Sequence, residues 1–362
     1  MSRSNQTLLE LLRGTVPGFY SLGKDETGYL NPVQMGRLYT NTALLVTSME
    51  FIKEQLWLQE RQDERLGEVT SWGALIAPLF RLELAPLLFL KEFLMVRGPQ
   101  EIRKITRDAE VIAGNLLTMI QQRPWADQKE FVIQALRDMS DHFLREEQLQ
   151  EGGAQNSGHR GPRHYRTFDG LDGIFDFRYR SDEGTEVESS EERLYKGSGV
   201  GVQSGYSTIL LALHSLDLEP GAKIIDLGSG FGRVGLVFAL MRPDIAFTGY
   251  EFVARRVEGA NQASRSMNLE DSLAFKRQDL SLESFEIPDA DVYYLYDPFT
   301  ESTYRHVLDQ LVAVSRRKPS TIVTKGNARD RLDPIALENK WPDPVRLDQG
   351  NLCLYRSMPP GI

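Results

Sequence analysis

Three glycines at alternate positions, Gly228, Gly230 and Gly232, form the stretch of this 362-residue chain that is best suited to ligand chemistry. They follow an apolar strand, Lys223–Leu227, and precede a helical pattern that begins near Arg233. Glycine lets the backbone turn tightly and approach a ligand, because it has no Cβ atom. A helix N-terminus adds N–H groups and the positive end of a dipole. The stretch therefore predicts a nucleotide-type binding turn, and a glycine turn without a ligand is the alternative.

The spacing of these glycines separates two classes of ligand. It is G-x-G-x-G, whereas dinucleotide-binding turns have G-x-G-x-x-G and hold a pyrophosphate at the helix N-terminus. S-adenosylmethionine (SAM) has no pyrophosphate. The spacing therefore favours SAM over NAD as the cofactor.

Acidic residues follow the next two predicted strands, residues 246–250 and 273–277. In a doubly wound sheet these strand ends lie beside the glycine turn. We expect Glu251, which Phe252 follows, to accept hydrogen bonds from ribose hydroxyls. Asp279 is placed to accept one from an adenine amino group, and Leu280 to pack on the ring. Helix caps or surface carboxylates are the alternative for each acid.

A fourth predicted strand, Val292–Tyr296, leads into Asp297, Pro298 and Phe299. These three residues are the candidate catalytic group, because this strand emerges on the far side of the switch point, where a transferable methyl group would lie. Proline fixes the backbone of the turn, so that its carbonyls and the Asp297 carboxylate can face a nucleophile. Phe299 offers an aromatic face to a cation. An ordinary proline turn before the helix at 301–315 is the alternative.

The segment at 195–205 is rich in glycine and precedes a predicted helix that starts near Tyr206. Such a segment can fold over a bound ligand, and Gln203 within it is a further candidate cofactor contact. An ordinary flexible connection is the alternative.

The elements that must position these residues divide into two parts. Residues 195–362 predict an α/β domain, a Rossmann-like, doubly wound, seven-stranded sheet that ends in an antiparallel hairpin near residues 345–347 and 352–355. Residues 1–150 predict an all-α helical bundle that recruits substrate, forms a dimer or serves as a scaffold. One helical stripe consists of Met35, Leu38, Thr42, Leu45, Met49, Ile52 and Leu56. Two more consist of Ile102, Ile105, Ala109, Ile112, Leu116 and Met119, and of Val132, Leu136, Met139 and Phe143.

Residues 151–194 predict a linker followed by an acidic segment. His159 and His164 lie in the linker without companion ligands at metal spacing, so we expect solvated loop histidines and no metal site. The acidic run from Asp182 to Glu192 is typical of a solvated surface, and a basic substrate is the alternative.

Composition sets outer limits on function. A formal charge of −9 argues against a dedicated nucleic-acid binder, whose affinity would depend on Lys and Arg. A single cysteine, Cys353, and an N-terminus without an apolar signal core predict a cytoplasmic protein. The most apolar window, residues 73–96, contains four charged residues and two prolines, so we expect an interrupted pair of buried helices and no membrane span.

With these motifs, residues 195–356 resemble the class I, seven-stranded SAM-dependent methyltransferases. The resemblance rests on D-L-G-S-G-F-G-R at 226–233, G-Y-E at 249–251, Q-D-L at 278–280 and Y-D-P-F at 296–299. It implies that Asp226, Ser229 and Arg233 join the three glycines in holding the methionine part of SAM. It also implies a ribose contact at Glu251 and an adenine contact at Asp279.

The form of the first motif is similar to that of non-SET histone-lysine and other protein-lysine methyltransferases. The chain departs from the histone enzymes at the fourth strand, where they have an Asn-Asn-Phe type sequence and this chain has Asp297-Pro298-Phe299. The resemblance does not cover residues 1–150. It implies transfer of a methyl group from SAM to an acceptor nucleophile, in the first place an amine such as a protein lysine.

Two other functions stay open: a biosynthetic methyltransferase whose helical domain covers a small-molecule pocket, and a non-catalytic interaction protein with a degenerate Rossmann-like domain. The expected partner is a protein or small-molecule methyl acceptor, and a homodimer through the helical domain is a further possibility.

Overall fold

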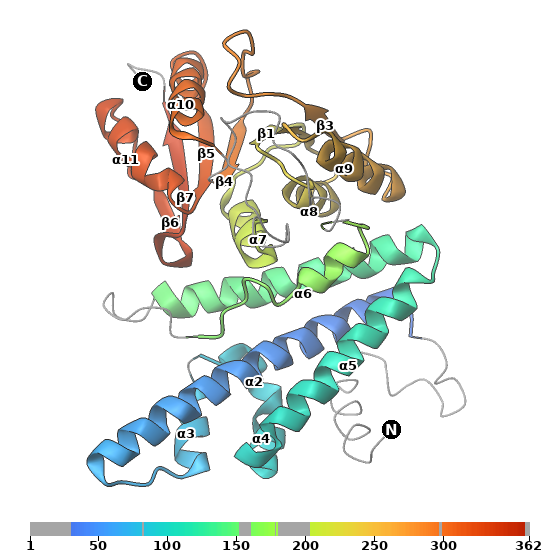
Figure 1. The fold of residues 1–362 in the computed structure, drawn as a ribbon, viewed down its shortest axis with the longest axis vertical. Coiled ribbons are helices and arrows are strands. Elements are labelled where there is room, and N and C mark those ends of the chain that lie inside the picture. Colours follow the sequence, from blue (N-terminus) through green and yellow to red (C-terminus); the bar gives the residue numbers. More distant parts are fainter. Residues whose placement is uncertain are drawn as a thin grey trace. The chain divides into compact units, whose positions relative to one another are not determined.

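The structure is a computed structural model that describes residues 30–81, 83–151, 161–177, 179, 203–296 and 299–358. The chain forms two compact units, Met1–Ile174 and Phe175–Ile362 (Figure 1). The first is helical and the second contains the sheet. The described residues from 161 to 174, which were expected to lie in a linker, belong to the helical unit.

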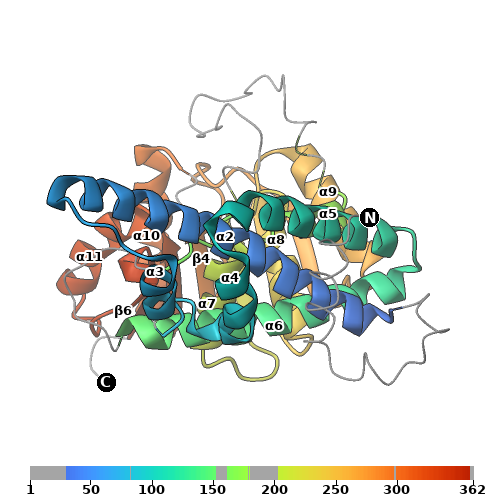
Figure 2. The ribbon, with the colours of Figure 1, turned by 90° about the horizontal axis from the view of Figure 1, so that it is seen from below.

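The helical unit is built on three long helices, α2 (Pro32–Leu66), α5 (Ile102–Gln121) and α6 (Trp125–Glu151). Shorter helices, α3 (Trp72–Leu79) and α4 (Lys91–Arg97), lie between the first two in sequence. The described part of this unit also contains three 3₁₀ segments: η2 (Ala85–Leu90), η3 (Pro99–Glu101) and η4 (Asp169–Gly173). Figure 2 shows α2 beside α5, and both α5 and α6 pack on α2.

A capping box begins α2. The Asn31 side chain accepts a hydrogen bond from the backbone N–H of Gln34 at 2.8 Å, and the Gln34 side chain accepts one from the backbone N–H of Asn31 at 3.1 Å. These reciprocal bonds satisfy two N–H groups that a helix start otherwise leaves unpaired, and Pro32 adds a preset backbone angle.

The predicted helical stripes form the core of this unit. From Met35 to Ile52 every predicted member is buried, whereas Leu56 is half-buried. One prediction was wrong: Met119 is 43% exposed, and Ile120 is buried in its place. The buried positions of α5 advance by four residues from Ile112 onward, so the next inward position after Leu116 is Ile120.

The window at 73–96 is interrupted as expected, because α3 ends at Leu79 and α4 begins only at Lys91. No helix in the described part of the chain is long and apolar enough to cross a membrane.

The second unit contains a seven-stranded sheet with the order β3-β2-β1-β4-β5-β7-β6. Its strands are β1 (Lys223–Leu227), β2 (Ala246–Glu251), β3 (Leu273–Arg277), β4 (Val292–Tyr296), β5 (Ser320–Lys325), β6 (Val345–Leu347) and β7 (Leu352–Ser357). The first five are parallel, and β7 pairs antiparallel with both β5 and β6. The predicted doubly wound sheet with a terminal antiparallel hairpin is therefore confirmed. The order reverses between β1 and β4, which creates the switch point where ligands bind in such sheets.

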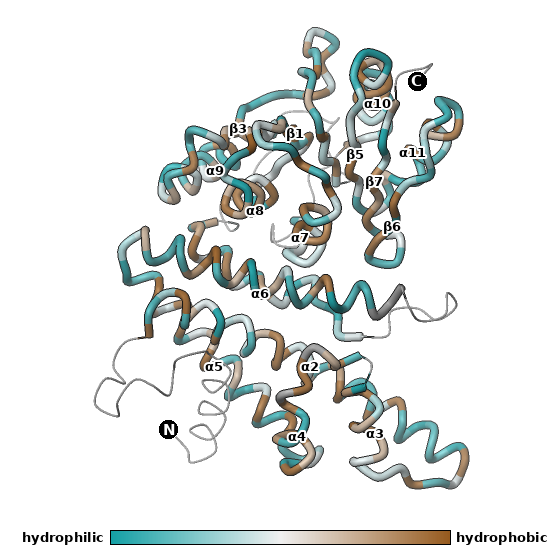
Figure 3. Tube along the Cα trace, turned by 180° about the vertical axis from the view of Figure 1, so that it is seen from behind, coloured by the Kyte–Doolittle hydropathy of each residue, from teal (hydrophilic) through white to brown (hydrophobic). Residues whose placement is uncertain are grey.

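The helices of this unit are α7 (Tyr206–Ser215), α8 (Arg233–Met241), α9 (Ala254–Ser266), α10 (Glu301–Ser315) and α11 (Ala328–Glu338). Helix α11 was not predicted from the sequence. Figure 3 shows α7 and α8 coloured as mainly hydrophobic, and nearly every residue of α8 is buried.

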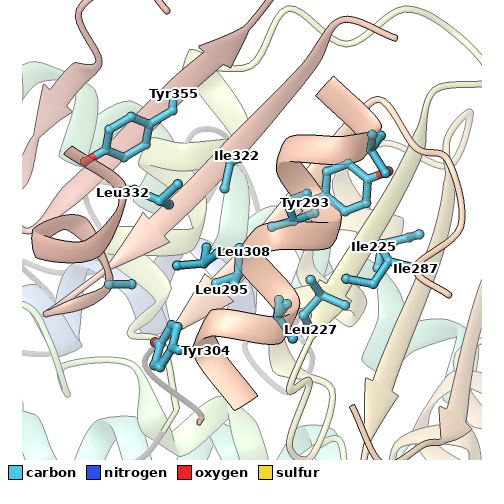
Figure 4. Packing of buried hydrophobic residues seen from close by; sticks show 14 of the residues in the cluster. Ile225, Leu227, Ile287, Tyr293, Leu295, Tyr304, Leu308, Ile322, Leu332 and Tyr355 are labelled. Carbon is cyan, nitrogen blue, oxygen red and sulfur yellow. The ribbon is translucent and has the colours of Figure 1, made fainter. Parts of the chain in front are cut away.

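One face of the sheet packs on α10 and α11 in a continuous apolar core (Figure 4). Ile225 and Leu227 of β1 and Leu295 of β4 lie in this cluster with Leu308 of α10 and Leu332 of α11. Alternate residues such as Ile224 and Val292 are also buried but lie outside the cluster. Burial on both faces explains why these strands have nearly continuous apolar sequences.

Candidate cofactor-binding site

The glycine turn lies at the carboxyl end of β1, at the switch point of the sheet. In the register, Asp226 of β1 is opposite Gly249 of β2 on one side and Tyr294 of β4 on the other. The φ angles of Gly228, Gly230 and Gly232 are 94°, 57° and 85°, which are left-handed conformations that favour glycine. The turn therefore requires its three glycines for its backbone shape alone.

Close packing adds a second requirement at Gly232. A Cβ atom there would lie 2.6 Å from Cζ of Phe275 and 2.9 Å from Cβ of Ala260, so β3 and α9 occupy the space a side chain would need. At Gly230 the neighbour is instead polar, because a Cβ would lie 2.9 Å from Nε2 of Gln203. This contact places the predicted Gln203 directly against the turn.

Four backbone N–H groups of the turn, which were expected to point at a ligand, instead donate hydrogen bonds within the protein. Those of Gly228 and Ser229 both donate to the carbonyl of Tyr250 at 2.9 Å, and that of Gly232 donates to the carbonyl of Ser229 at 2.9 Å. The N–H of Gly230 donates to a side chain, Oε2 of Glu251, at 2.8 Å. These four groups are used inside the protein, because the tight turn folds back onto the end of β2. They do not form a cradle for phosphate.

Glu251 is buried and holds the turn to the end of β2. Its Oε1 atom accepts hydrogen bonds from the N–H of Val253 at 3.1 Å and from Nη1 of Arg256 at 3.4 Å. Among the described residues, its Oε2 atom accepts one bond, from Gly230. Since a carboxylate oxygen can accept about two hydrogen bonds, Oε2 retains capacity for one donor from a ligand.

Two further polar atoms at the turn are buried without any hydrogen-bond partner among the described residues: Oδ2 of Asp226 and Oγ of Ser229. Burial raises the pKa of the Asp226 carboxyl well above its ordinary value, and the nearby Glu251 raises it further. Buried polar groups are nearly always paired in folded proteins. These two atoms therefore mark a place where a ligand would supply the missing partners.

Arg233, predicted as a cofactor contact, lies fully buried and ties the turn to the chain before α7. Its Nη1 donates to the carbonyl of Ser204 at 3.0 Å, and its guanidinium carbon lies 4.9 Å from the ring centroid of Tyr206. The Ser204 hydroxyl is in turn 2.8 Å from the hydroxyl of Tyr294 on β4. Ser204 and Tyr294 were not predicted from the sequence, because no spacing or motif distinguishes them from other polar residues in the glycine-rich segment and the buried strand.

The remaining candidates lie in different settings. Asp279 accepts hydrogen bonds from the N–H and hydroxyl of Ser281 at 2.9 and 2.6 Å, and Phe252 is half-buried. Leu280 and Phe299 are both buried members of the apolar cluster. The ring of Phe299 packs edge-on against Tyr304, with 5.2 Å between centroids. Asp297 and Pro298 lie outside the described residues, as does most of the predicted lid, residues 195–202.

One surface pocket of this unit lies at the opposite, amino end of the strands. It is lined by residues 215–222 together with Asp291, Val292, Thr321 and Arg356. It contains none of the predicted site residues and lies away from the switch point.

Comparison with known proteins gives short matches. The chain is 31% identical over 72 residues to a ribosomal RNA small subunit methyltransferase G of Christiangramia forsetii, a match that covers 18% of this chain and 34% of the relative. It is 33% identical over 76 residues to the protein of the same name from Polaromonas naphthalenivorans, covering 21% and 34%. The chain thus spans about a third of the length of these relatives. No family model matches the chain.

Among solved structures, an RNA methyltransferase from Salinibacter ruber in complex with S-adenosylhomocysteine aligns with a TM-score of 0.35 and 21% identity. The alignment covers 44% of this chain and 96% of that one. A SAM-dependent methyltransferase from Geobacter sulfurreducens, also in complex with S-adenosylhomocysteine, aligns with a TM-score of 0.27 and 21% identity, covering 32% and 46%.

Proposed function

We propose that the second unit binds SAM at the glycine turn and is a SAM-dependent methyltransferase. The observation that carries the proposal is the group of three acceptor atoms around the turn: the unpaired Oδ2 of Asp226, the unpaired Oγ of Ser229 and the partly used Oε2 of Glu251. Ribose hydroxyls and an amino group are the kinds of donor that would satisfy them. The two ribosomal RNA methyltransferases that match this chain support the same assignment.

Charge favours SAM over a dinucleotide. Asp226 and Glu251 are both buried and close enough for the Glu251 charge to raise the pKa of Asp226. A ligand with a sulfonium and an ammonium group would relieve the repulsion between the two carboxylates, whereas a pyrophosphate would increase it. The internal bonding of the N–H groups of Gly228, Ser229, Gly230 and Gly232 points the same way, because these four groups are not available to bind an anion.

In this proposal each residue has a positioning task. Glu251 fixes the ribose through Oε2, Asp226 faces the methionine end, Asp279 and Leu280 border the adenine, and Arg233 keeps Gln203 and Ser204 against the turn. When bound, SAM would supply an electrophilic methyl group to an acceptor nucleophile by in-line displacement, with S-adenosylhomocysteine as the leaving group. The protein then has mainly to align the two reactants and exclude water.

For the acceptor, an amine such as a protein lysine is our first candidate. Asp297 and the carbonyls of its turn would orient the amine lone pair, while loss of solvent lowers the pKa of the amine and frees that pair. RNA is the second candidate, favoured by the names of the two relatives, despite the charge of −9. A small-molecule acceptor is the third.

Titration calorimetry with SAM tests the binding site. The wild-type chain should bind SAM, and Glu251→Gln should weaken the binding by roughly 10- to 100-fold, since a hydrogen bond to a charged group contributes about 1.5–3 kcal/mol. Glu338→Gln, which changes an exposed glutamate on α11 in the same way, should leave the affinity unchanged. No binding of SAM by the wild-type chain would refute the methyltransferase assignment.

A second experiment identifies the acceptor. The full chain is incubated with methyl-labelled SAM and fractionated cell extract, and the label is followed into protein, RNA and small molecules. Label in protein that is lost in an Asp297→Ala variant, with SAM affinity retained, supports the amine. Label in RNA alone would replace the first candidate by the second.

A further inference from the structure

Three side chains of the helical unit meet at one point. His142 and Glu146 lie one turn apart on α6, and His164 lies in the segment that follows this helix in the described chain. Nε2 of His164 is 3.2 Å from Oε1 of Glu146 and 3.4 Å from Nε2 of His142. Nε2 of His142 is 3.5 Å from the same Oε1. The prediction that His164 is a solvated loop histidine was therefore wrong, while His159 lies outside the described residues.

This triangle of two nitrogens and one oxygen can be held together by hydrogen bonds or by a bound cation, and the two arrangements use the lone pairs differently. Each Nε2 carries at most one proton, and an ionised carboxylate only accepts. If both nitrogens donate to Oε1 of Glu146, the two N–H groups converge on one oxygen, with their nitrogens only 3.4 Å apart. If one nitrogen accepts from the other, only one of the nitrogens has a proton to share between two acceptors. A cation at the centre would instead use the lone pairs of all three atoms.

The dimensions suit a small transition-metal ion. Zinc bonds nitrogen and oxygen ligands at about 2.0–2.2 Å in a tetrahedral arrangement, which puts the ligand atoms about 3.3–3.5 Å apart. Two of the observed separations, 3.4 and 3.5 Å, lie in this range, and the third, 3.2 Å, is about 0.1 Å shorter. Oxygen-only cations such as Mg²⁺ and Ca²⁺ are disfavoured by the two imidazoles.

The surroundings hold the ligands in place. His142 and His164 are 6% and 7% exposed, and the ring of Phe143 lies 5.6 and 5.4 Å from their centroids. Nδ1 of His164 is 3.4 Å from the hydroxyl of Thr167, which is 2.8 Å from the hydroxyl of Thr47 on α2. If the Thr167 hydroxyl accepts a hydrogen bond from Nδ1–H, the proton of the imidazole is on Nδ1 and the lone pair of Nε2 is available to a metal. Metal-bound histidines are commonly oriented by such a hydrogen bond.

We propose that His142, Glu146 and His164 form a Zn²⁺ site with a fourth position for water or an external ligand. The ion links residue 164 to α6 and so fastens the segment at 161–168 to the helical unit. This proposal involves neither the glycine turn nor SAM, and it holds or fails independently of the methyltransferase assignment.

The test uses the full chain after removal of metal with a chelator. Titration calorimetry with Zn²⁺ should give one tight site per chain, and the melting temperature should rise on saturation. Glu146→Gln and His164→Gln should each weaken this binding by more than about tenfold and abolish the rise. His214→Gln, a matched change of an exposed histidine on α7, should retain both.

Two further measurements keep the test decisive if a ligand variant fails to fold. Co²⁺ added to the wild-type chain should give the intense visible absorption of a four-coordinate site, and Zn²⁺ should displace it. Thr167→Val should weaken Zn²⁺ binding by about 10- to 100-fold through the orientation of His164. No Zn²⁺ binding to the wild-type chain, or binding that is equally lost in His214→Gln, would overturn the proposal and leave a hydrogen-bonded cluster.

Discussion

Oε2 of Glu251 accepts a hydrogen bond from the backbone N–H of Gly230 at 2.8 Å. This bond joins the end of β2 to the middle of the glycine turn after β1, so that a carboxylate suited to a ligand also holds the shape of the turn. Shape and binding are thus coupled through one side chain, and changes at this place should affect both.

Glu251→Gln should destabilise the chain even without a ligand. The amide keeps one acceptor oxygen but cannot serve Gly230, Val253 and Arg256 together, and it removes the charge that strengthens these bonds. We expect the free energy of unfolding to fall by about 1–3 kcal/mol, measured by urea denaturation. An unchanged denaturation midpoint would show that the turn does not depend on this carboxylate.

Gly232→Ala should reduce the stability of the chain more than a change to alanine at another glycine of the same unit. Alanine at this position must adopt a φ near 85°, and its Cβ atom would lie 2.6 Å from the ring of Phe275. Overpacking of this kind costs about 1–3 kcal/mol, before the backbone strain is added.

Gly259→Ala is the matched control for Gly232→Ala. Gly259 lies inside α9, and a Cβ there meets nothing within 4 Å. Replacing a helical glycine by alanine should stabilise the chain by about 0.5–1 kcal/mol. Thermal denaturation should therefore shift in opposite directions for the two variants, and shifts of the same sign would contradict the packing described here.

Asp226→Asn should make the stability of the chain less sensitive to pH. Burial, and secondarily Glu251, raise the pKa of the native Asp226 carboxyl above its ordinary value of 3.8. The native state therefore holds its proton more tightly than the unfolded state. As the pH rises from 3.8 toward the raised pKa, the wild-type chain loses stability that the variant keeps.

The expected result is a variant that is more stable than the wild type at pH 7, with a difference that shrinks as the pH falls to about 4. Urea denaturation across this range measures it. Asp271→Asn, at an exposed position, serves as the control and should follow the wild type at every pH. A difference that grows toward acid would reverse the sign argued for Asp226.

Arg233→Met should loosen the start of α7. The variant loses the bond from Nη1 to the carbonyl of Ser204, and leaves that buried carbonyl with one partner fewer. Hydrogen bonds to charged groups contribute about 1.5–3 kcal/mol. Amide hydrogen exchange at residues 203–206 should become faster.

Tyr294→Phe removes the second tie to the same segment, the 2.8 Å contact with the Ser204 hydroxyl, and should cost about 0.5–1.5 kcal/mol. Arg317→Met breaks an exposed ion pair with Asp289 and should leave the stability nearly unchanged, because solvent screens such pairs. An equal effect of Arg233→Met and Arg317→Met would argue against the proposed role of Arg233.

The sequence by itself determined the order of the strands in the second unit and most of its helices, although it did not predict α11. Buried parallel strands must be continuously apolar, and the glycine spacing at 228, 230 and 232 permits only a tight turn, so both features are local and can be recognised along the chain. The stripes of α2, α5 and α6 were recognisable for the same reason. One position in these stripes was predicted wrongly, Met119 in place of Ile120. A helix has 3.6 residues per turn, so the buried positions move around the helix along its length.

Only the tertiary structure decided how the polar groups are used. The N–H groups of the turn bond to Tyr250, Ser229 and Glu251, and Ser204 meets Tyr294 across 90 positions of sequence. His164 meets His142 and Glu146, whose spacing of four on one helix face was the only signal in the sequence. A hydrogen bond between residues remote in the chain forms only if the donor–acceptor distance is correct to within a few tenths of an ångström. Residue type and spacing do not contain those distances, because they arise when the elements pack together.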